Sequence, residues 1–336
     1  MKRQLATAIA AFFAMLLIIV IVTTQPFVLP IKSVSPAADQ VRLKNTVRHL
    51  SENLYPRSFD QPLKLAAAGA FIRDGFVAAG ARVTEQIVMV QGERFVNIVA
   101  HFGPESAALL VIGAHYDSHG DVITAAKMGK RYSAETHTPG ADDNASGVAG
   151  LIELAYLLGK KAPSKAIELV AYTLEEPPHF RTDDMGSARH AQSLSQNNRP
   201  VELMISLEMI GYFSDEPNSQ NFPIPGMSLI YPTAGNFISI VSRLQDWSQT
   251  RRLKAAMAGS SDLPVYSINT LPAILGVDFS DHLNYWAHGI PAIMITDTAF
   301  NRNKEYHLSG DTYDRLDYKR MAKVVEGVYS FIMHRT

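Results

Sequence analysis

The apolar residues of this chain change their period along its length, and the change predicts where helices and strands lie. Between residues 61 and 79 they recur at close to 3.6-residue spacing, which indicates an amphipathic helix. Residues 108–115 instead read ALLVIGAH, a nearly continuous apolar run that is typical of a strand covered on both faces. The same reasoning predicts strands at 82–90, 95–102, 167–174, 203–210, 227–231 and 291–296, and helices at 40–54, 144–159 and 318–333.

Buried strands that alternate with helices predict an α/β fold, a three-layer α/β/α sandwich around a central mixed, mostly parallel sheet. Residues 237–248 are amphipathic, and residues 251–276 are less regular, so we expect a lid or a strand excursion there. Residues 25–39 contain three prolines and indicate a linker. We therefore expect one catalytic domain over residues 40–336.

The first residues form a separate segment. Lys2 and Arg3 precede an uncharged apolar run from Leu5 to Val22, long enough as a helix for a hydrocarbon core of about 30 Å. Residues 1–24 are therefore expected to be a signal anchor or transmembrane helix. A cleaved signal peptide is the alternative, although its apolar core is usually only about 7–15 residues long. The charge before the run places the catalytic domain outside the cytoplasm, periplasmic or extracellular, and secreted if the segment is cleaved.

Charge and composition narrow the chemistry. The formal net charge is -1, which argues against a general nucleic-acid-binding protein, because such proteins concentrate positive charge against phosphates. The chain has no cysteine, so disulfides, thiolate ligands and a cysteine nucleophile are all excluded. Catalysis must then depend on histidine, carboxylates, serine or tyrosine.

Polar residues interrupt the apolar pattern where predicted strands end or the next helix begins. They are His115 and Asp117 in HYDSHG, Asp142 and Asp143 in PGADDNAS, Glu175 and Glu176 in TLEEPPHF, Glu208 in SLEMIG, and His307 in a late loop. In open α/β sheets, ligands bind beyond the carboxyl ends of the strands, so these side chains are expected at one edge.

Each of these residues also has an ordinary structural interpretation. A single buried histidine is usually hydrogen-bonded in the core, an aspartate before a helix usually caps it, and paired glutamates usually face solvent. Glu208 differs, because a carboxylate at the end of an apolar strand costs several kcal/mol unless it is paired or metal-bound. Together, two histidines and at least three carboxylates are the donors that a hydrolytic zinc site requires.

Two divalent ions about 3.5–4 Å apart need a carboxylate between them, and a further carboxylate can take a proton from the attacking water. The adjacent Glu175 and Glu176 suit this division, with one acting as the base and the other as a ligand.

Five motifs occur in a fixed order: HYDS, GADDNASG, EE, SDH followed by GIPA, and YH followed by DT. On these motifs, residues 115–317 resemble the co-catalytic zinc aminopeptidases typified by bacterial leucyl aminopeptidases. That family also includes glutamate carboxypeptidase II and the glutaminyl cyclases. The resemblance implies two Zn²⁺ ions per chain and a peptide substrate with a free N-terminus.

The resemblance also implies a role for each matching residue. His115 corresponds to a ligand of the first zinc, Asp117 to the residue that orients it, and Asp142 to the bridging carboxylate. Glu175 corresponds to the general base.

Glu176 and His307 correspond to ligands of the second zinc. Tyr306 corresponds to a tyrosine that donates a hydrogen bond to the developing oxyanion. Glu208 is a departure, since most such aminopeptidases carry aspartate there, and its longer side chain makes occupancy by two zinc ions the least secure part of the prediction.

The expected activity is that of an aminopeptidase, in which a zinc-bound hydroxide attacks the first peptide bond with Glu175 as the base. One alternative is a glutaminyl-cyclase-like acyltransferase, which uses a single zinc. Another is a receptor-like relative without catalysis, against which the retained ligand residues argue. The sequence does not predict the oligomeric state.

Overall fold

The computed structural model describes residues 2–105, 108–120 and 137–335. One eight-stranded sheet forms its centre, in the order β1-β2-β4-β3-β5-β8-β6-β7. The strands are β1 (Arg82–Val90), β2 (Glu93–Phe102), β3 (Leu109–His115), β4 (Ile167–Tyr172), β5 (Val201–Glu208), β6 (Ile238–Arg243), β7 (Val265–Thr270) and β8 (Ala292–Thr296). The central strands β4, β3, β5 and β8 are parallel, whereas β1, β2 and β6 each have an antiparallel neighbour.

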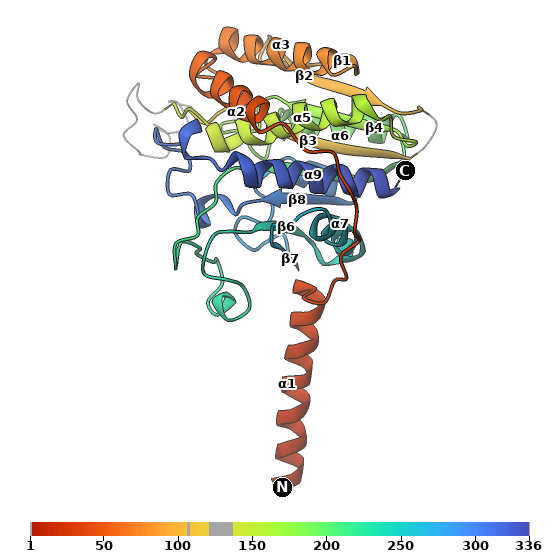
Figure 1. Ribbon diagram of the computed structural model, residues 1–336, viewed down its shortest axis with the longest axis vertical. Helices are drawn as coiled ribbons and strands as arrows, with labels where there is room; N and C mark the ends of the chain where they lie inside the picture. The colour runs from red at the N-terminus through yellow and green to blue at the C-terminus, as the bar shows by residue number, and fades with distance from the viewer. Residues whose placement is uncertain (1, 106–107, 121–136, 336) are drawn as a thin grey trace.

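Helices cover both faces of this sheet, which confirms the predicted three-layer α/β/α fold (Figure 1). The helices are α1 (Lys2–Thr24), α2 (Gln40–Arg48), α3 (Pro62–Ala78), α5 (Gly147–Lys160), α6 (Gly186–Gln196), α7 (Trp247–Ser260), α8 (His282–Ala287) and α9 (Tyr318–Arg335). The larger core packs α2, α3, α5, α7 and α9 against one face, and α6 and α8 cover the other.

The alternation of side chains along each strand builds these two cores. On β3, Leu110 and Ile112 belong to the larger core, whereas Leu109 and Val111 belong to the smaller one. Both sets are buried, so β3 has no polar residue before His115. A strand covered on both faces therefore carries its first polar side chain only where it leaves the sheet.

Several segments differ from the pattern-based prediction. Residues 227–231 are not a strand: Met227–Leu229 is a short 3₁₀ turn, and Leu229 is 89% exposed. Residues 237–248, for which only amphipathic character was predicted, contain the strand β6 and the start of the helix α7. Residues 251–276, predicted to form a lid or a strand excursion, hold most of α7 and all of the strand β7.

Helix α1 projects from the body beside β7 (Figure 1). Lys254 Nζ donates to the carbonyls of Thr24 and Gln25, and Asn269 Nδ2 donates to that of Thr23, so the body caps the end of α1. Residues 25–39 then pass along α7 and α9, where Ile31 N donates to Ala255 O.

The expectation of a membrane anchor needs correction. Across the described residues, no helix combines the length and the apolar character that crossing a membrane requires. The sequence prediction rested on the length and apolar character of the run from Leu5 to Val22. The predicted transmembrane helix, and the membrane-anchored localisation derived from it, are therefore wrong.

Candidate metal centre

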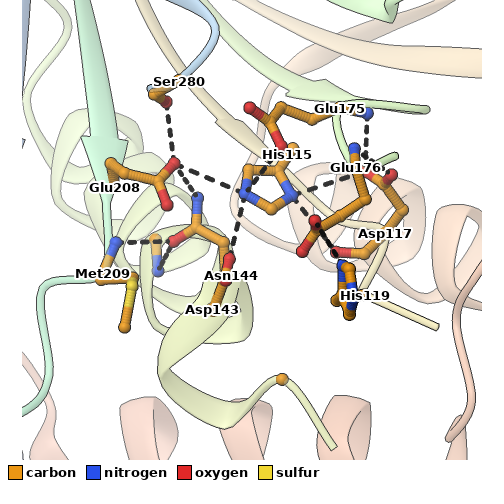
Figure 2. Close-up of polar contacts among 12 residues, drawn as sticks. His115, Asp117, His119, Asp143, Asn144, Glu175, Glu176, Glu208, Met209 and Ser280 are labelled. Atoms are coloured by element: carbon orange, nitrogen blue, oxygen red, sulfur yellow. Dashed lines mark hydrogen bonds and ion pairs between the residues drawn. The ribbon is translucent and has the colours of Figure 1, made fainter. Parts of the chain in front are cut away.

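The polar residues that follow the central parallel strands meet at one edge of the sheet. His115 is the last residue of β3, Glu208 is the last residue of β5, and Glu175 and Glu176 follow β4. Because these strands are parallel neighbours, their carboxyl ends lie together. Figure 2 shows the side chains pointing toward one another from these separate segments.

One cluster surrounds His115 Nε2. It lies 3.3 Å from Asp143 Oδ1, 3.4 Å from Glu208 Oε2 and 3.9 Å from Glu175 Oε2. All four side chains are buried. On the other side of the ring, Nδ1 faces the carboxylate and the carbonyl oxygen of Asp117, at 3.4 and 3.2 Å. A proton on Nδ1 therefore leaves the Nε2 lone pair available for a metal ion.

A second cluster surrounds His307 Nε2. It lies 3.1 Å from Asp143 Oδ2 and 3.4 Å from Glu176 Oε2. Asp143 thus presents one carboxylate oxygen to each histidine. This places a single carboxylate between the two clusters, which is the arrangement that a bridging ligand requires.

The structure places Asp143 in the position that the sequence analysis assigned to Asp142. Asp142 faces away from both histidines: its Oδ1 accepts from Gly211 N at 3.0 Å and its Oδ2 accepts from Asn303 Nδ2 at 3.1 Å. The sequence offered two adjacent aspartates, and only the backbone decides which one enters the site. Asp143, with φ -101° and ψ 92°, and Asn144, with φ -131° and ψ 37°, both depart from helical geometry within this turn, and the side chain of Asp143 faces the histidines.

Buried neighbours hold this turn, Ala141–Ser146, in place. Asp311 accepts hydrogen bonds from the backbone N–H groups of Asp142 and Asp143. Asn144 connects the turn to the end of β5, because its Nδ2 donates to Leu207 O at 2.8 Å. Its Oδ1 also accepts from Met209 N at 3.0 Å (Figure 2). The position of Asp143 is thus fixed relative to Glu208.

Asp117 organises a second part of the site. In addition to facing His115, its carboxylate accepts from the backbone N–H groups of Glu175 and Glu176, at 3.1 and 2.9 Å. It therefore orients one histidine and fixes the path of the Glu-Glu segment. The structure brings together His115, Asp117, Glu175, Glu176, Glu208 and His307 as the sequence predicted.

The close carboxylates strongly affect one another's protonation. Burial raises the pKa of Glu175 well above its usual range, against the opposing charge of His115. Burial likewise raises the pKa of Glu176 to about 8. Burial also favours the neutral acid of Asp143, but hydrogen bonds from His115 and His307 outweigh it and lower the pKa of that carboxyl.

Glu208 is held by groups that the sequence analysis did not assign. Ser280 Oγ donates to Glu208 Oε2 at 2.7 Å, and Ser206 Oγ lies 2.7 Å from Ser280 Oγ. Ser280 belongs to the SDH motif, so part of that motif fixes the longer glutamate side chain at the end of β5. The next residue, Asp281, is fully buried, and burial raises its pKa to about 7.

Two aromatic residues border the second cluster. Tyr306 stacks on His307 with ring centroids 3.8 Å apart. The ring of His119 also stacks on His307, with centroids 3.9 Å apart. His119 Nδ1 also lies 3.3 Å from Glu176 Oε2. An imidazole nitrogen binds a metal ion in the plane of its ring. Because the rings of His119 and His307 are stacked and nearly parallel, one ion cannot lie in both ring planes. His119 is therefore a neighbour of the proposed ligands rather than an additional ligand beside His307. The sequence analysis did not single out His119, although it lies in the HYDSHG motif.

The residues present fit two zinc ions. Four ligands arranged tetrahedrally at about 2.0–2.1 Å from zinc lie about 3.3 Å from one another. The distances in the two clusters, 3.1–3.4 Å, match this value. They join His115 Nε2 to oxygens of Asp143 and Glu208, and His307 Nε2 to oxygens of Asp143 and Glu176. In addition, Glu176 Oε1 is buried without a hydrogen-bond partner among the described residues, as expected of an oxygen that faces a metal ion.

An apolar cavity opens beside the metal centre. Glu208 and Tyr306 form part of its wall, and it encloses about 860 Å³ including the part open to solvent. Its other walls come from β6, β7 and β8 and from the loops around residues 220–231 and 274–279. The apolar lining includes Phe222, Met227, Phe237, Val241, Ile268 and Met294.

Residues 97–332 match peptidase family M28, which covers most of the chain and all of the residues around the two clusters. The chain belongs to peptidase family M28. Its zinc-exopeptidase fold and its paired histidine and carboxylate clusters agree with this membership. The M28 chain is also 51% identical over 334 residues to the uncharacterized protein YfbL of Escherichia coli (strain K12), covering 99% of both chains.

More distant relatives carry functional names. The chain is 23% identical over 239 residues to a probable leucine aminopeptidase of Arthroderma otae, covering 69% of this chain and 55% of that protein. Among solved structures, a leucine aminopeptidase precursor from Bacteroides thetaiotaomicron has a TM-score of 0.67 at 19% identity, covering 91% of this chain and 100% of that one. A glutaminyl cyclase from the same organism also gives 0.67 at 19% identity, over 90% and 100% of the two chains. These structural similarities establish the shared fold.

Proposed function

We propose that this M28 peptidase is a zinc aminopeptidase that removes bulky apolar residues from the N-terminus of peptides. The observation that carries the proposal is the apolar cavity beside the two clusters, with Glu208 and Tyr306 shared between cavity and metal centre. A side chain held in that cavity brings its own peptide carbonyl to the metal centre. The cavity wall offers apolar contacts for leucine, phenylalanine or methionine side chains.

His115, Asp143 and Glu208 would hold one zinc ion, and Asp143, Glu176 and His307 the other. This assignment gives the bridging role to Asp143 rather than to Asp142. Bound zinc would supply a Lewis acid that polarises the scissile carbonyl and acidifies water. The negative charge of the surrounding carboxylates also favours a substrate with a free, positively charged amino group.

Glu175 is suited to move the proton. Its carboxylate lies 3.9 Å from His115 Nε2 and makes no ion pair with His307 in the described structure, and burial raises its pKa well above its usual range. In the proposed reaction Glu175 accepts a proton from the attacking water and passes it to the leaving amine nitrogen. Both steps use the same carboxylate, so no other base is needed.

Tyr306 is suited to assist at the carbonyl oxygen. Burial and the nearby charges of Asp143 and Glu176 raise the pKa of Tyr306 well above its usual range, so the hydroxyl keeps its proton. A protonated phenol beside the cavity can donate a hydrogen bond to the oxygen as negative charge develops on it.

The test compares aminoacyl-nitroanilides of leucine, phenylalanine, alanine, glutamate and lysine, with N-acetyl-leucine nitroanilide as the blocked control. The proposal predicts the highest kcat/KM for leucine or phenylalanine, no cleavage of the blocked compound, and loss of activity with a chelator that added zinc reverses. Cleavage of the blocked compound, or a preference for glutamate, would contradict it. Release of ammonia from a peptide with N-terminal glutamine, without hydrolysis of any nitroanilide, would instead identify a glutaminyl cyclase.

The role of Glu175 is tested by the substitution Glu175→Gln, which removes the base without removing a ligand. We expect hydrolysis to fall by about 10²–10⁴-fold, while the zinc content measured by atomic absorption stays at the wild-type value. The matched variant Glu176→Gln should lose zinc as well as activity. An active Glu175→Gln enzyme would assign the base to another group.

A further inference from the structure

Among the described residues, Arg57 heads the fully buried side chains by volume, and its guanidinium group contacts the segments next to His115 and Asp143. It precedes residue 97, where the match to the family begins. Burial lowers the pKa of Arg57 to about 10, so the guanidinium group remains charged at neutral pH. A buried cation normally has a carboxylate partner, but the hydrogen bonds of Arg57 in the described structure all go to backbone carbonyl oxygens.

These carbonyl oxygens belong to three different segments. Arg57 Nε donates to Tyr116 O at 2.9 Å, Nη1 donates to Leu50 O and Pro139 O at 3.0 and 2.7 Å, and Nη2 donates to Gly140 O at 2.8 Å. Tyr116 directly follows the ligand His115, and Gly140 lies at the start of the turn that carries Asp143. One planar group therefore joins two of the three segments that supply the proposed ligands of the first zinc, those of His115 and Asp143, while Glu208 comes from β5.

The surrounding residues strengthen this connection. Ser118 N donates to Arg57 O at 3.2 Å, Tyr55 Oη donates to His137 O at 2.8 Å, and Asp60 lies 2.9 Å from His137 Nε2. We call residues 55–60 the clasp, because they contact both the segment after β3 and the segment before Asp143. Gly140 permits the close approach: it has φ +57°, and a Cβ there would lie 2.9 Å from the Arg57 guanidinium and 2.3 Å from Asp143 O.

We propose that Arg57 is a positioning residue for the metal centre, which fixes His115 relative to Asp143 by holding the carbonyl groups of Tyr116 and Gly140 with one guanidinium group. Only arginine offers five N–H donors in a rigid planar fork, whereas lysine offers three donors on a single atom. The charge contributes as well, because Asp117, Asp143, Asp311 and Glu176 lie within electrostatic reach of it. The chain thereby gathers these carboxylates before any metal ion binds.

The inference rests on the metal assignment proposed above, and its test reads zinc binding rather than hydrolysis. Zinc affinity of the metal-free full chain is measured by competition with a chromophoric chelator, for the wild type and for Arg57→Lys. We expect the dissociation constant for zinc to rise by about 10- to 100-fold, as is usual when an outer-shell partner of a metal site is removed. The melting temperature is measured with and without zinc in the same samples.

The matched control is Arg42→Lys. Arg42 also forms a partly buried pair, with Glu153, but it joins α2 to α5 away from both clusters. If Arg57 served stability alone, both variants would melt earlier and the increase in melting temperature on adding zinc would match the wild type. The proposal predicts a smaller increase for Arg57→Lys only. An unchanged zinc affinity in folded Arg57→Lys would overturn it.

A second variant keeps the test decisive if Arg57→Lys does not fold. Tyr55→Phe removes a single hydroxyl group from the clasp, the one that donates to His137 O. The loss of one such hydrogen bond is expected to weaken zinc binding by about two- to tenfold. Wild-type zinc affinity in Tyr55→Phe would then count against the proposal. A wild-type chain that binds no zinc would instead refute the metal assignment on which the inference rests.

Discussion

Asp142 and Asp143 carry the same carboxylate on adjacent residues but have opposite environments. Asp143 lies between two histidines, and their hydrogen bonds lower its pKa. Asp142 is buried beside Asp297, and this burial raises the pKa of Asp142 well above its usual range. The anion is therefore favoured at Asp143, whereas burial shifts Asp142 toward the neutral acid. An amide is close in shape to a neutral acid but cannot replace a bridging anion.

This difference predicts opposite results for two matched substitutions. Asp143→Asn should lose zinc and reduce hydrolysis by at least about 10²-fold, because the shared ligand becomes a neutral amide. Asp142→Asn should keep its zinc content and most of its activity, because Asp142 faces away from both histidines and burial disfavours its charged form. Zinc content and kcat/KM of the two purified variants are the measurements. Loss of zinc from Asp142→Asn with retention by Asp143→Asn would restore the assignment made from the sequence.

The strand ends show how much of the site could be predicted before the structure was known. His115, Glu175 and Glu208 were found because each ends a buried apolar run, and a polar group there has few ordinary explanations. The choice between Asp142 and Asp143 depends on a local break in helical geometry at Asp143 and Asn144, which the residue pattern does not encode. Arg57 was missed because its partners are carbonyl groups, which every sequence contains at every position.

Periodicity failed in the elements that form the apolar cavity. Residues 237–248 change from strand to helix within a window too short to separate a period of two from one of 3.6. The apolar residues around Met227 suggested a strand, whereas this segment forms part of the cavity wall. In the sequence, apolar side chains that line a cavity therefore look the same as apolar side chains that pack in a core.

The cavity wall formed by β6 offers a test of substrate preference. Val241 lies on β6 opposite Met294 of β8 and lines the cavity. Val241→Phe should fill part of the space and lower kcat/KM for the leucine substrate by at least about tenfold, since a single methylene in such pockets changes specificity by about 10- to 200-fold. The alanine substrate should be affected much less. The ratio of kcat/KM values for the two substrates is the measurement.

Val265→Phe is the matched control, because Val265 lies on the neighbouring strand β7 and contributes to a different cavity. Its leucine-to-alanine ratio should equal that of the wild type. An unchanged ratio in folded Val241→Phe would show that the N-terminal side chain binds elsewhere.

Over the whole molecule, the fold gathers several carboxylates at one place without balancing their charge. Burial raises the pKa of Glu176 to about 8 and that of Asp281 to about 7, and it also raises the pKa of Glu175. The three-layer sandwich and the clasp hold these carboxyl groups together, although the carboxylates repel one another when they are ionised. A metal ion removes this repulsion, so stability, pH and zinc should be linked.

The sign of this linkage follows from the direction of the shifts. A carboxyl whose pKa is higher in the folded protein binds more protons when folded than when unfolded, so the free energy of unfolding falls as the pH rises. For Glu176 this loss extends from the ordinary value of 4.5 to about 8. The raised pKa of His115 acts in the same direction, because its neighbours Glu175 and Glu208 favour the charged ring against burial. His282 has the opposite effect below pH 6.5. Burial lowers its pKa to about 4, so its contribution to the free energy of unfolding rises with pH up to 6.5.

We therefore expect the chelated protein to melt at progressively lower temperature between about pH 6.5 and 8, where His282 no longer contributes. With zinc the decline should be much smaller, because zinc replaces the protons and binds more tightly as they leave. Thermal unfolding at several pH values, with zinc and with a chelator, measures both curves. The Glu176→Gln variant should show a flatter curve in the chelated state, because it lacks one of the groups that lose a proton. Parallel curves with and without zinc would show that these carboxylates do not bind the metal.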